Sequence, residues 1–76
     1  NMIKEGISFS VGNDFRNIYN IESIDGDMCI ISWLESGIIE STKYNLKLVK
    51  KHFNDGVWIR NIKHERMLKI EKLKDI

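Results

Sequence analysis

The sequence predicts a mainly β domain: a small, five-stranded, partly open barrel with a short helix before the last strand. Runs rich in β-branched and aromatic residues recur along the chain, and such runs are typical of strands. Clusters of Gly, Asn, Asp and Ser separate these runs and are typical of turns. The length of 76 residues allows only one small hydrophobic core.

The predicted strands alternate with clear turn signals. The expected ranges are 7–11, 15–24, 28–34, 38–44 and 57–62. Gly12-Asn13-Asp14 separates the first two, and Glu35-Ser36-Gly37 separates the third and fourth. The second to fourth strands therefore form a meander of neighbouring antiparallel strands.

Asp25-Gly26 lies at the centre of the most strongly patterned hairpin in the sequence. A two-residue loop at Asp25-Gly26 would divide the large apolar side chains of the hairpin between both faces. A three-residue loop at residues 24–26 brings them to one face, with Ile30 on the outer face. We therefore predict the three-residue loop with a bulge at Gly26. The side chains predicted to share the core face are Tyr19, Ile21, Cys29, Ile31 and Trp33.

Two helices are expected in the second half of the chain. Asn45 has the character of an N-cap, and Leu46, Val49 and Phe53 recur on one helical face. Gly56 is expected to end this helix in a left-handed conformation. The sequence divides into a β-barrel domain, residues 1–62, and an amphipathic C-terminal extension, residues 63–76.

The extension is predicted to be helical, with a strand as the alternative. Met67, Ile70, Leu73 and Ile76 recur every three residues, and Glu65 and Lys69 form an i,i+4 pair. These apolar side chains are expected either to fold back over the open face of the hairpin or to contact a partner, including a second copy.

A wider pattern of apolar residues and turns covers residues 7–62. It consists of Tyr19, Ile21, Ile24-Asp25-Gly26-Asp27, Cys29, Ile31, Trp33, Tyr44-Asn45-Leu46, Val49, Asp55-Gly56 and Trp58. The pattern resembles small Tudor-like barrels of the Src-homology-3-like fold, as seen in bacterial and phage proteins. The resemblance implies a domain that binds peptides, modified side chains or nucleic acid and rarely catalyses a reaction.

The residue types do not form a catalytic, cofactor or metal signature. His52 and His64 match no zinc-binding spacing, and no serine lies in a nucleophile-elbow sequence. Asp25 and Asp27 flank a glycine, so a turn explains them. We therefore expect no enzyme activity, no cofactor and no metal.

Composition also bears on location and origin. The chain has one cysteine, Cys29, no apolar run long enough to span a membrane and no signal-peptide pattern at its start. A cytoplasmic protein is expected. The abundance of Ile, Lys and Asn, which have A/T-rich codons, points to a bacterial, phage or mobile-element genome.

Charge is distributed unevenly along the chain. Residues 1–42 contain two basic and seven acidic side chains, whereas residues 43–76 contain ten basic and four acidic ones. Such asymmetry is typical of proteins that bind an anionic partner or associate with one another. The basic residues are Lys43, Lys47, Lys50, Lys51, Arg60, Lys63, Arg66, Lys69, Lys72 and Lys74.

The predicted function is non-enzymatic binding of a protein partner by a small intracellular adaptor or inhibitor. The alternative is sequence-nonspecific binding of nucleic acid by basic residues 43–74. Phe15 and Trp58 are the aromatic residues expected to be exposed. Strand parity argues against an aromatic cage for a methylated cation, because it assigns Tyr19 and Trp33 to the core. The predicted partner-binding residues are Lys47, Lys50, Lys51, Trp58, Arg60, Arg66 and Lys69.

Overall fold

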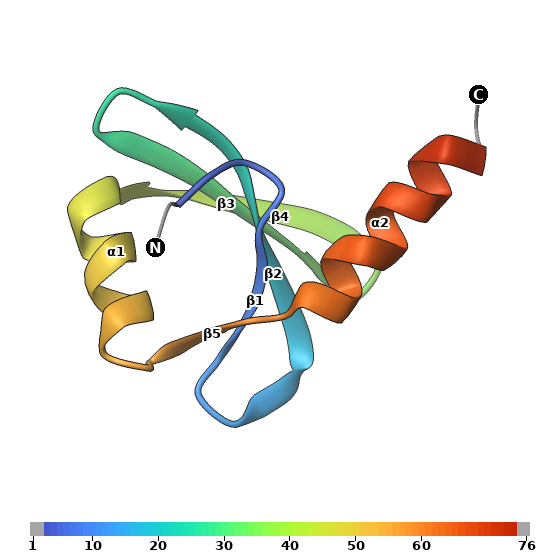
Figure 1. The fold of residues 1–76 in the computed structure, drawn as a ribbon, viewed down its shortest axis with the longest axis horizontal. Coiled ribbons are helices and arrows are strands. Elements are labelled where there is room, and N and C mark those ends of the chain that lie inside the picture. The colour runs from blue at the N-terminus through green and yellow to red at the C-terminus, as the bar shows by residue number, and fades with distance from the viewer. Residues whose placement is uncertain (1–2, 75–76) are drawn as a thin grey trace.

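The computed structural model describes residues 3–74, which form five strands and two helices. The elements are β1 (Ser8–Val11), β2 (Asp14–Asp25), β3 (Met28–Glu35), β4 (Ile38–Asn45), α1 (Leu46–Asn54), β5 (Trp58–Arg60) and α2 (Ile62–Lys74). All strand pairs are antiparallel, in one open sheet of order β4-β3-β2-β1-β5 (Figure 1). The predicted mainly β architecture, with a helix before the fifth strand, is confirmed at this level.

The turn between β2 and β3 differs from the prediction. Asp25 pairs with Met28, so the loop consists of two residues, Gly26 and Asp27. Gly26 has φ of 61°, as the first central residue of a type II′ hairpin turn requires. The predicted three-residue loop with a bulge at Gly26 is therefore wrong.

The predicted sharing of one face is nevertheless confirmed, because a bulge lies elsewhere in the hairpin. Ile21 pairs with Ile31, but Ser23 pairs with Ile30, which leaves Glu22 as one extra residue in β2. The extra residue restores the parity that the two-residue turn would otherwise break. As a result, Ile21, Ile31 and Cys29 are all buried.

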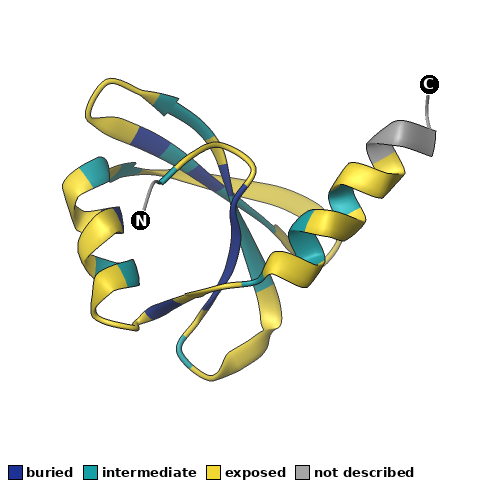
Figure 2. Cartoon of the chain, viewed as in Figure 1, coloured by how far each residue is buried: buried dark blue, intermediate teal, exposed yellow. Residues whose placement is uncertain are grey.

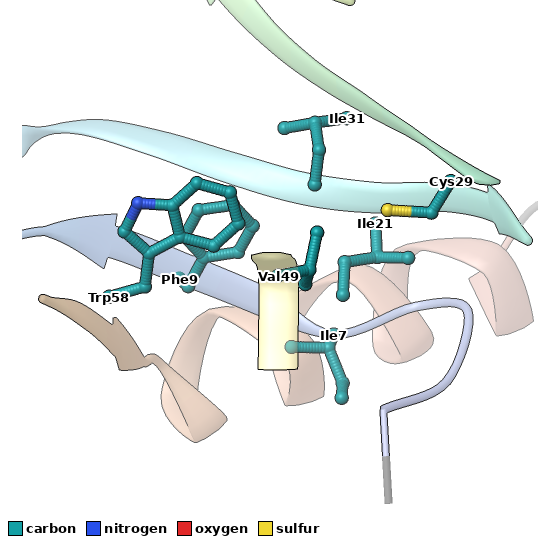
Figure 3. Packing of buried hydrophobic residues seen from close by; sticks show 7 residues of the cluster. All are labelled: Ile7, Phe9, Ile21, Cys29, Ile31, Val49 and Trp58. Carbon is teal, nitrogen blue, oxygen red and sulfur yellow. The ribbon is translucent and has the colours of Figure 1, made fainter. Parts of the chain in front are cut away.

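The core lies between the inner face of the sheet and α1 (Figure 3). Phe9 stacks on Trp58 with ring centroids 4.5 Å apart, and Val49 is the buried residue of α1. Trp58 is only 6% exposed, so the prediction that it is exposed is wrong, whereas Phe15 is 66% exposed as predicted. The buried hydrophobic residues are Ile7, Phe9, Ile21, Cys29, Ile31, Val49 and Trp58.

The ends of α1 are as predicted. The side-chain oxygen of Asn45 accepts a hydrogen bond from the backbone N–H of Lys47 at 2.9 Å, which is the contact of an N-cap. At the other end, Gly56 has φ of 74° and its N–H donates to the Phe53 carbonyl.

The helical prediction for the C-terminal extension is confirmed, whereas the predicted folding back of its apolar side chains onto the sheet is wrong for Met67 and Ile70. The alternative, contact with a partner, stays a prediction. Met67 and Ile70 are 51% and 53% exposed, and Figure 2 shows much of α2 as exposed. The more buried side chains are those of His64, Glu65 and Leu68. The side chain of Leu73 and the whole of Ile76 lie outside the described part of the chain.

Among the described residues, no helix is long and apolar enough to cross a membrane.

Candidate functional site

The inner face of the sheet opens into a cavity of about 340 Å³, which we call the aromatic cleft. Phe9 and Trp58 form its buried floor, whereas the other rings are half-buried and reach the surface. Val11, Ile31 and Thr42 complete the lining. The aromatic residues that line it are Phe9, Tyr19, Trp33, Tyr44 and Trp58.

Strand register places these rings together. Tyr19 of β2 pairs with Trp33 of β3, and Cys29 of β3 pairs with Tyr44 of β4, so all of them share the inner face. The rings of Tyr19 and Trp33 lie 5.4 Å apart, and Tyr44 meets Trp58 edge to face at 5.2 Å. Because each ring packs against another, the walls of the cleft are held in place before any ligand arrives.

Two carboxylates lie on the same face as the aromatic cleft. Glu40 of β4 pairs directly with Trp33, and directly paired residues share a face. Glu35 is two residues beyond Trp33 in β3 and also shares this face. Both side chains are exposed. Neither carboxylate lines the cleft itself, but both extend the same sheet face beyond Trp33. The electron-rich ring faces of the cleft suit an apolar or a cationic side chain.

A second polar cluster lies on the outer face, at the junction of β1 and α2. The hydroxyl of Ser8, a fully buried residue, donates to Asn20 at 2.7 Å. The Ser8 hydroxyl has one proton, which it donates to Asn20, so toward His64 its oxygen can only accept. Nδ1–H of His64 therefore donates to the Ser8 oxygen at 3.1 Å. The Asn61 side chain accepts from the backbone N–H of His64 at 2.9 Å near the start of α2. These contacts satisfy buried polar groups where the helix meets the sheet.

Arg60 and Glu65 close this junction. Two hydrogen bonds of 2.8 Å join the guanidinium to the carboxylate. These bonds lower the pKa of Glu65 and outweigh the partial burial that would raise it. Glu65 therefore pairs with Arg60 in the structure, and not with Lys69 as predicted.

Three lysines form the basic surface of α1: Lys47, Lys50 and Lys51. All three side chains are exposed. Within the described part of the chain, none of them takes part in a salt bridge. Exposed positive charge of this kind attracts anions by long-range electrostatics.

The other predicted partner-binding residues do not gather with these lysines into one patch. Trp58 is buried in the core, and Arg60 already binds Glu65. Arg66 and Lys69 are exposed on α2, which begins after β5 and lies apart from α1 (Figure 1). Their role in partner binding stays a prediction.

A larger pocket of about 520 Å³ lies beside β5. Ile3, Ile7 and Phe53 give it an apolar wall, and Lys4 and Arg60 contribute cationic side chains. Ile3 and Lys4 precede the first strand, so part of the lining of this pocket comes from outside the sheet. The aromatic cleft, whose lining comes entirely from strands, is the better-defined candidate.

Among residues 3–74, no group of three or more His, Cys, Asp or Glu side chains is arranged to hold a metal ion. No protein-family model, curated protein or solved structure matches the chain. The assignment of the candidate site therefore rests on its geometry.

Strand parity predicts the correct face for Tyr19 and Trp33 but assigns both to the core, and it wrongly predicts that Trp58 is exposed. Parity distinguishes two faces of a strand and does not show where a face leaves the interior. Glu35 and Glu40 are the signal for that boundary. They share the parity of Trp33, and charged residues at core-face positions indicate that this end of the face is open to solvent.

Proposed function

We propose that this chain is a non-enzymatic binding module that takes a side chain of a protein partner into the aromatic cleft. The observation that carries the proposal is the set of half-exposed rings, Tyr19, Trp33 and Tyr44, around one preformed cavity. Aromatic residues that are already held rigidly in a concave site give much contact area with little loss of conformational entropy on binding.

Glu40 indicates which kind of partner side chain the aromatic cleft is expected to bind. Its carboxylate lies on the same face as the ring of Trp33, directly across the strand pair. A Lys or Arg side chain of the partner would meet aromatic faces and a carboxylate together, which favours a cation over an anion. The partner segment is therefore expected to be basic.

The strand order supports a finer assignment of the fold. The order β4-β3-β2-β1-β5, with a helix between β4 and β5, fits the arrangement expected for a Tudor-like barrel of the Src-homology-3-like fold. Such barrels generally bind peptides, modified side chains or nucleic acid. This support is an analogy of fold and is weaker than the geometry of the cleft.

The polar cluster at Ser8 and His64 supports a structural role and not a catalytic one. Ser8 is 0% exposed, and its proton is donated to Asn20 and not toward the imidazole. Glu65, which would orient a catalytic histidine, binds Arg60. We therefore infer that the cluster attaches α2 to the sheet.

A second candidate function is sequence-nonspecific binding of nucleic acid. The basic surface of α1 is the observation that favours it, because exposed lysines can bind phosphates without reading bases.

Exposed Met67 and Ile70 on α2 would offer a separate contact to a partner or to a second copy. Under either function we place the module in the cytoplasm of a bacterium, encoded by the host or by a phage.

The proposal is tested with a displayed library of random peptides selected on the immobilised protein. Selected peptides are expected to contain Lys or Arg beside apolar residues. Their affinity, measured by fluorescence anisotropy, should fall at least about tenfold for Trp33→Leu or Tyr44→Leu, because each change removes an aromatic wall. Val57→Thr, which changes an exposed side chain outside the cleft, is the matched control and should bind as the wild type does.

The basic surface of α1 gives the opposing arm of this test. A Lys47→Glu/Lys50→Glu/Lys51→Glu variant should keep the affinity for the selected peptides. If that variant loses binding while the two cleft variants retain it, the aromatic cleft is not the site. Binding of a DNA or RNA duplex that weakens steeply with added salt would favour the second function instead.

A further inference from the structure

Among the strands that the structure describes, β4 is an edge strand, with β3 as its one neighbour. It lies at one end of the sheet and contains eight residues. The strand is exposed from Ile38 to Lys43 (Figure 2). The side chain of Ile39 is 76% exposed. A long, regular, exposed edge of this kind is a template for another strand.

The hydrogen bond just after the end of β4 shows which residues of the strand bond to β3 and which face the free edge. The N–H of Leu46 donates to the carbonyl of Asp27 at 2.7 Å, and these two residues continue the β3–β4 register by one pair. Bonded and non-bonded pairs alternate in an antiparallel ladder, so the even-numbered residues of β4 bond to β3. Ile39, Ser41 and Lys43 therefore direct their backbone N–H and C=O groups toward the free edge.

We propose that β4 pairs antiparallel with β4 of a second copy of this chain, about a twofold axis at Ser41. In this register Ile39 lies opposite Lys43 of the second copy, and Glu40 lies opposite Thr42. No like charges face each other, and the backbone groups of Ile39, Ser41 and Lys43 meet the equivalent groups of the other strand. Exposed Ile38 lies opposite the half-buried Tyr44.

The neighbouring registers are less favourable. A twofold axis at Glu40 places the two Glu40 carboxylates directly opposite each other, which is destabilising. An axis at Thr42 places Ile38 opposite Leu46, where the strand has ended and α1 has begun. The sequence of β4 therefore favours the axis at Ser41.

Dimerisation through β4 would also change the aromatic cleft. A twofold axis perpendicular to the sheet keeps both inner faces on the same side, so the two clefts would open in the same direction. Thr42 lines the cleft, and Glu40 of the second copy lies opposite it. Each cleft thus gains a carboxylate from the other copy. This consequence rests on the proposed function, whereas the dimer itself does not.

Sedimentation equilibrium of the full chain tests the dimer. A single strand pair is a small interface, so we expect the mass to rise from 8.9 kDa toward twice that value between about 10 µM and about 1 mM. Ser41→Pro removes an N–H that points to the free edge and not to β3, and should leave a folded monomer at every concentration. Near-UV circular dichroism of the tryptophans checks that the variant is folded.

A charge exchange tests the register. Thr42→Glu places a carboxylate opposite Glu40 at two symmetric positions and should weaken dimerisation at least about tenfold. The double variant Glu40→Lys/Thr42→Glu places the introduced lysine of each copy opposite the introduced glutamate of the other and should restore dimerisation. Thr42→Gln, which has no charge, is the matched control and should dimerise as the wild type does.

Three results would overturn the proposal. One is a wild-type chain that remains monomeric across the whole concentration range. The second is a dimer that Ser41→Pro leaves intact and Ile70→Lys abolishes, since that contact would lie on α2. The third is failure of the double variant to restore what Thr42→Glu removes. Peptide binding by the cleft is measured separately at low micromolar concentration, so either proposal can fail alone.

Discussion

Arg60 binds Glu65 through two hydrogen bonds of 2.8 Å, from Nε to Oε2 and from Nη2 to Oε1. Oε2 of Glu65 also accepts from the backbone N–H of Ser8 at 3.2 Å. One carboxylate thus joins β5, β1 and α2. Since Met67 and Ile70 remain exposed, these polar contacts, together with the half-buried Leu68, hold α2 on the sheet.

Glu65→Gln should lower the free energy of unfolding at pH 7 by about 1–2 kcal/mol, because charge-assisted hydrogen bonds are lost at a partly exposed pair. Urea unfolding monitored by tryptophan fluorescence measures the change. Glu71→Gln, an exposed carboxylate on the same helix, is the matched control and should have little effect. Equal stability of both variants would show that the Arg60–Glu65 pair does not hold α2.

The contribution of Glu65 should depend on pH in one direction. Its pKa is lowered below the ordinary value of 4.5 by the Arg60 hydrogen bonds, so the folded state favours the ionised form. The stabilisation is therefore fully present above about pH 4.5 and is lost as the pH falls through the lower folded-state pKa. The stability difference between wild type and Glu65→Gln should shrink as the pH is lowered from about 5 toward about 3. A difference that grows with acid would contradict this sign.

Ser36→Asn should stabilise the protein by roughly 0.5 kcal/mol, because Asn tolerates the left-handed region better than Ser. Ser36 has φ of 52° and precedes Gly37 with φ of 79°, and both form the turn between β3 and β4. Thermal unfolding at micromolar concentration measures the gain. The same substitution at Ser41, within the extended strand, should give none, and an equal gain at both positions would refute the explanation.

The thiol of Cys29 should react slowly in the native protein. Cys29 is 1% exposed, and burial raises the pKa of its thiol, which disfavours the reactive thiolate. Labelling with a disulfide reagent should be at least about a hundredfold slower than in urea, because it requires opening of the core. A Cys29→Ala/Ser41→Cys variant moves the thiol to an exposed strand and should react rapidly. Equal rates for the two native proteins would show that Cys29 is not enclosed.

The elements of this fold were predictable because local rules determine them. Asn45 caps α1, and the two hairpin turns contain Gly26 and Gly37, as expected. The register of the central hairpin was not predictable in detail. The two-residue turn, together with the bulge at Glu22, puts the same residues on the core face as the predicted three-residue loop would. The pattern of apolar residues shows only which side chains share a face, so it cannot distinguish the two-residue turn with its bulge from the three-residue loop.

The candidate site was less predictable than the fold. Trp58 shares strand parity with Arg60, so parity indicated an exposed side chain, which is wrong. Its burial follows from long-range packing against Phe9, Tyr44 and Phe53. Such contacts between distant segments determine which rings form the floor of the cleft and which reach the surface, and no local pattern contains them.

The most direct test of the account follows the ¹H–¹⁵N spectrum of the protein as a selected basic peptide is added. Binding in the aromatic cleft should shift the indole N–H of Trp33 and the backbone amides of Thr42 and Tyr44, and leave those of the basic surface of α1 unchanged. Shifts confined to Lys47, Lys50 and Lys51, with the Trp33 indole unmoved, would contradict the assignment of the cleft as the partner-binding site.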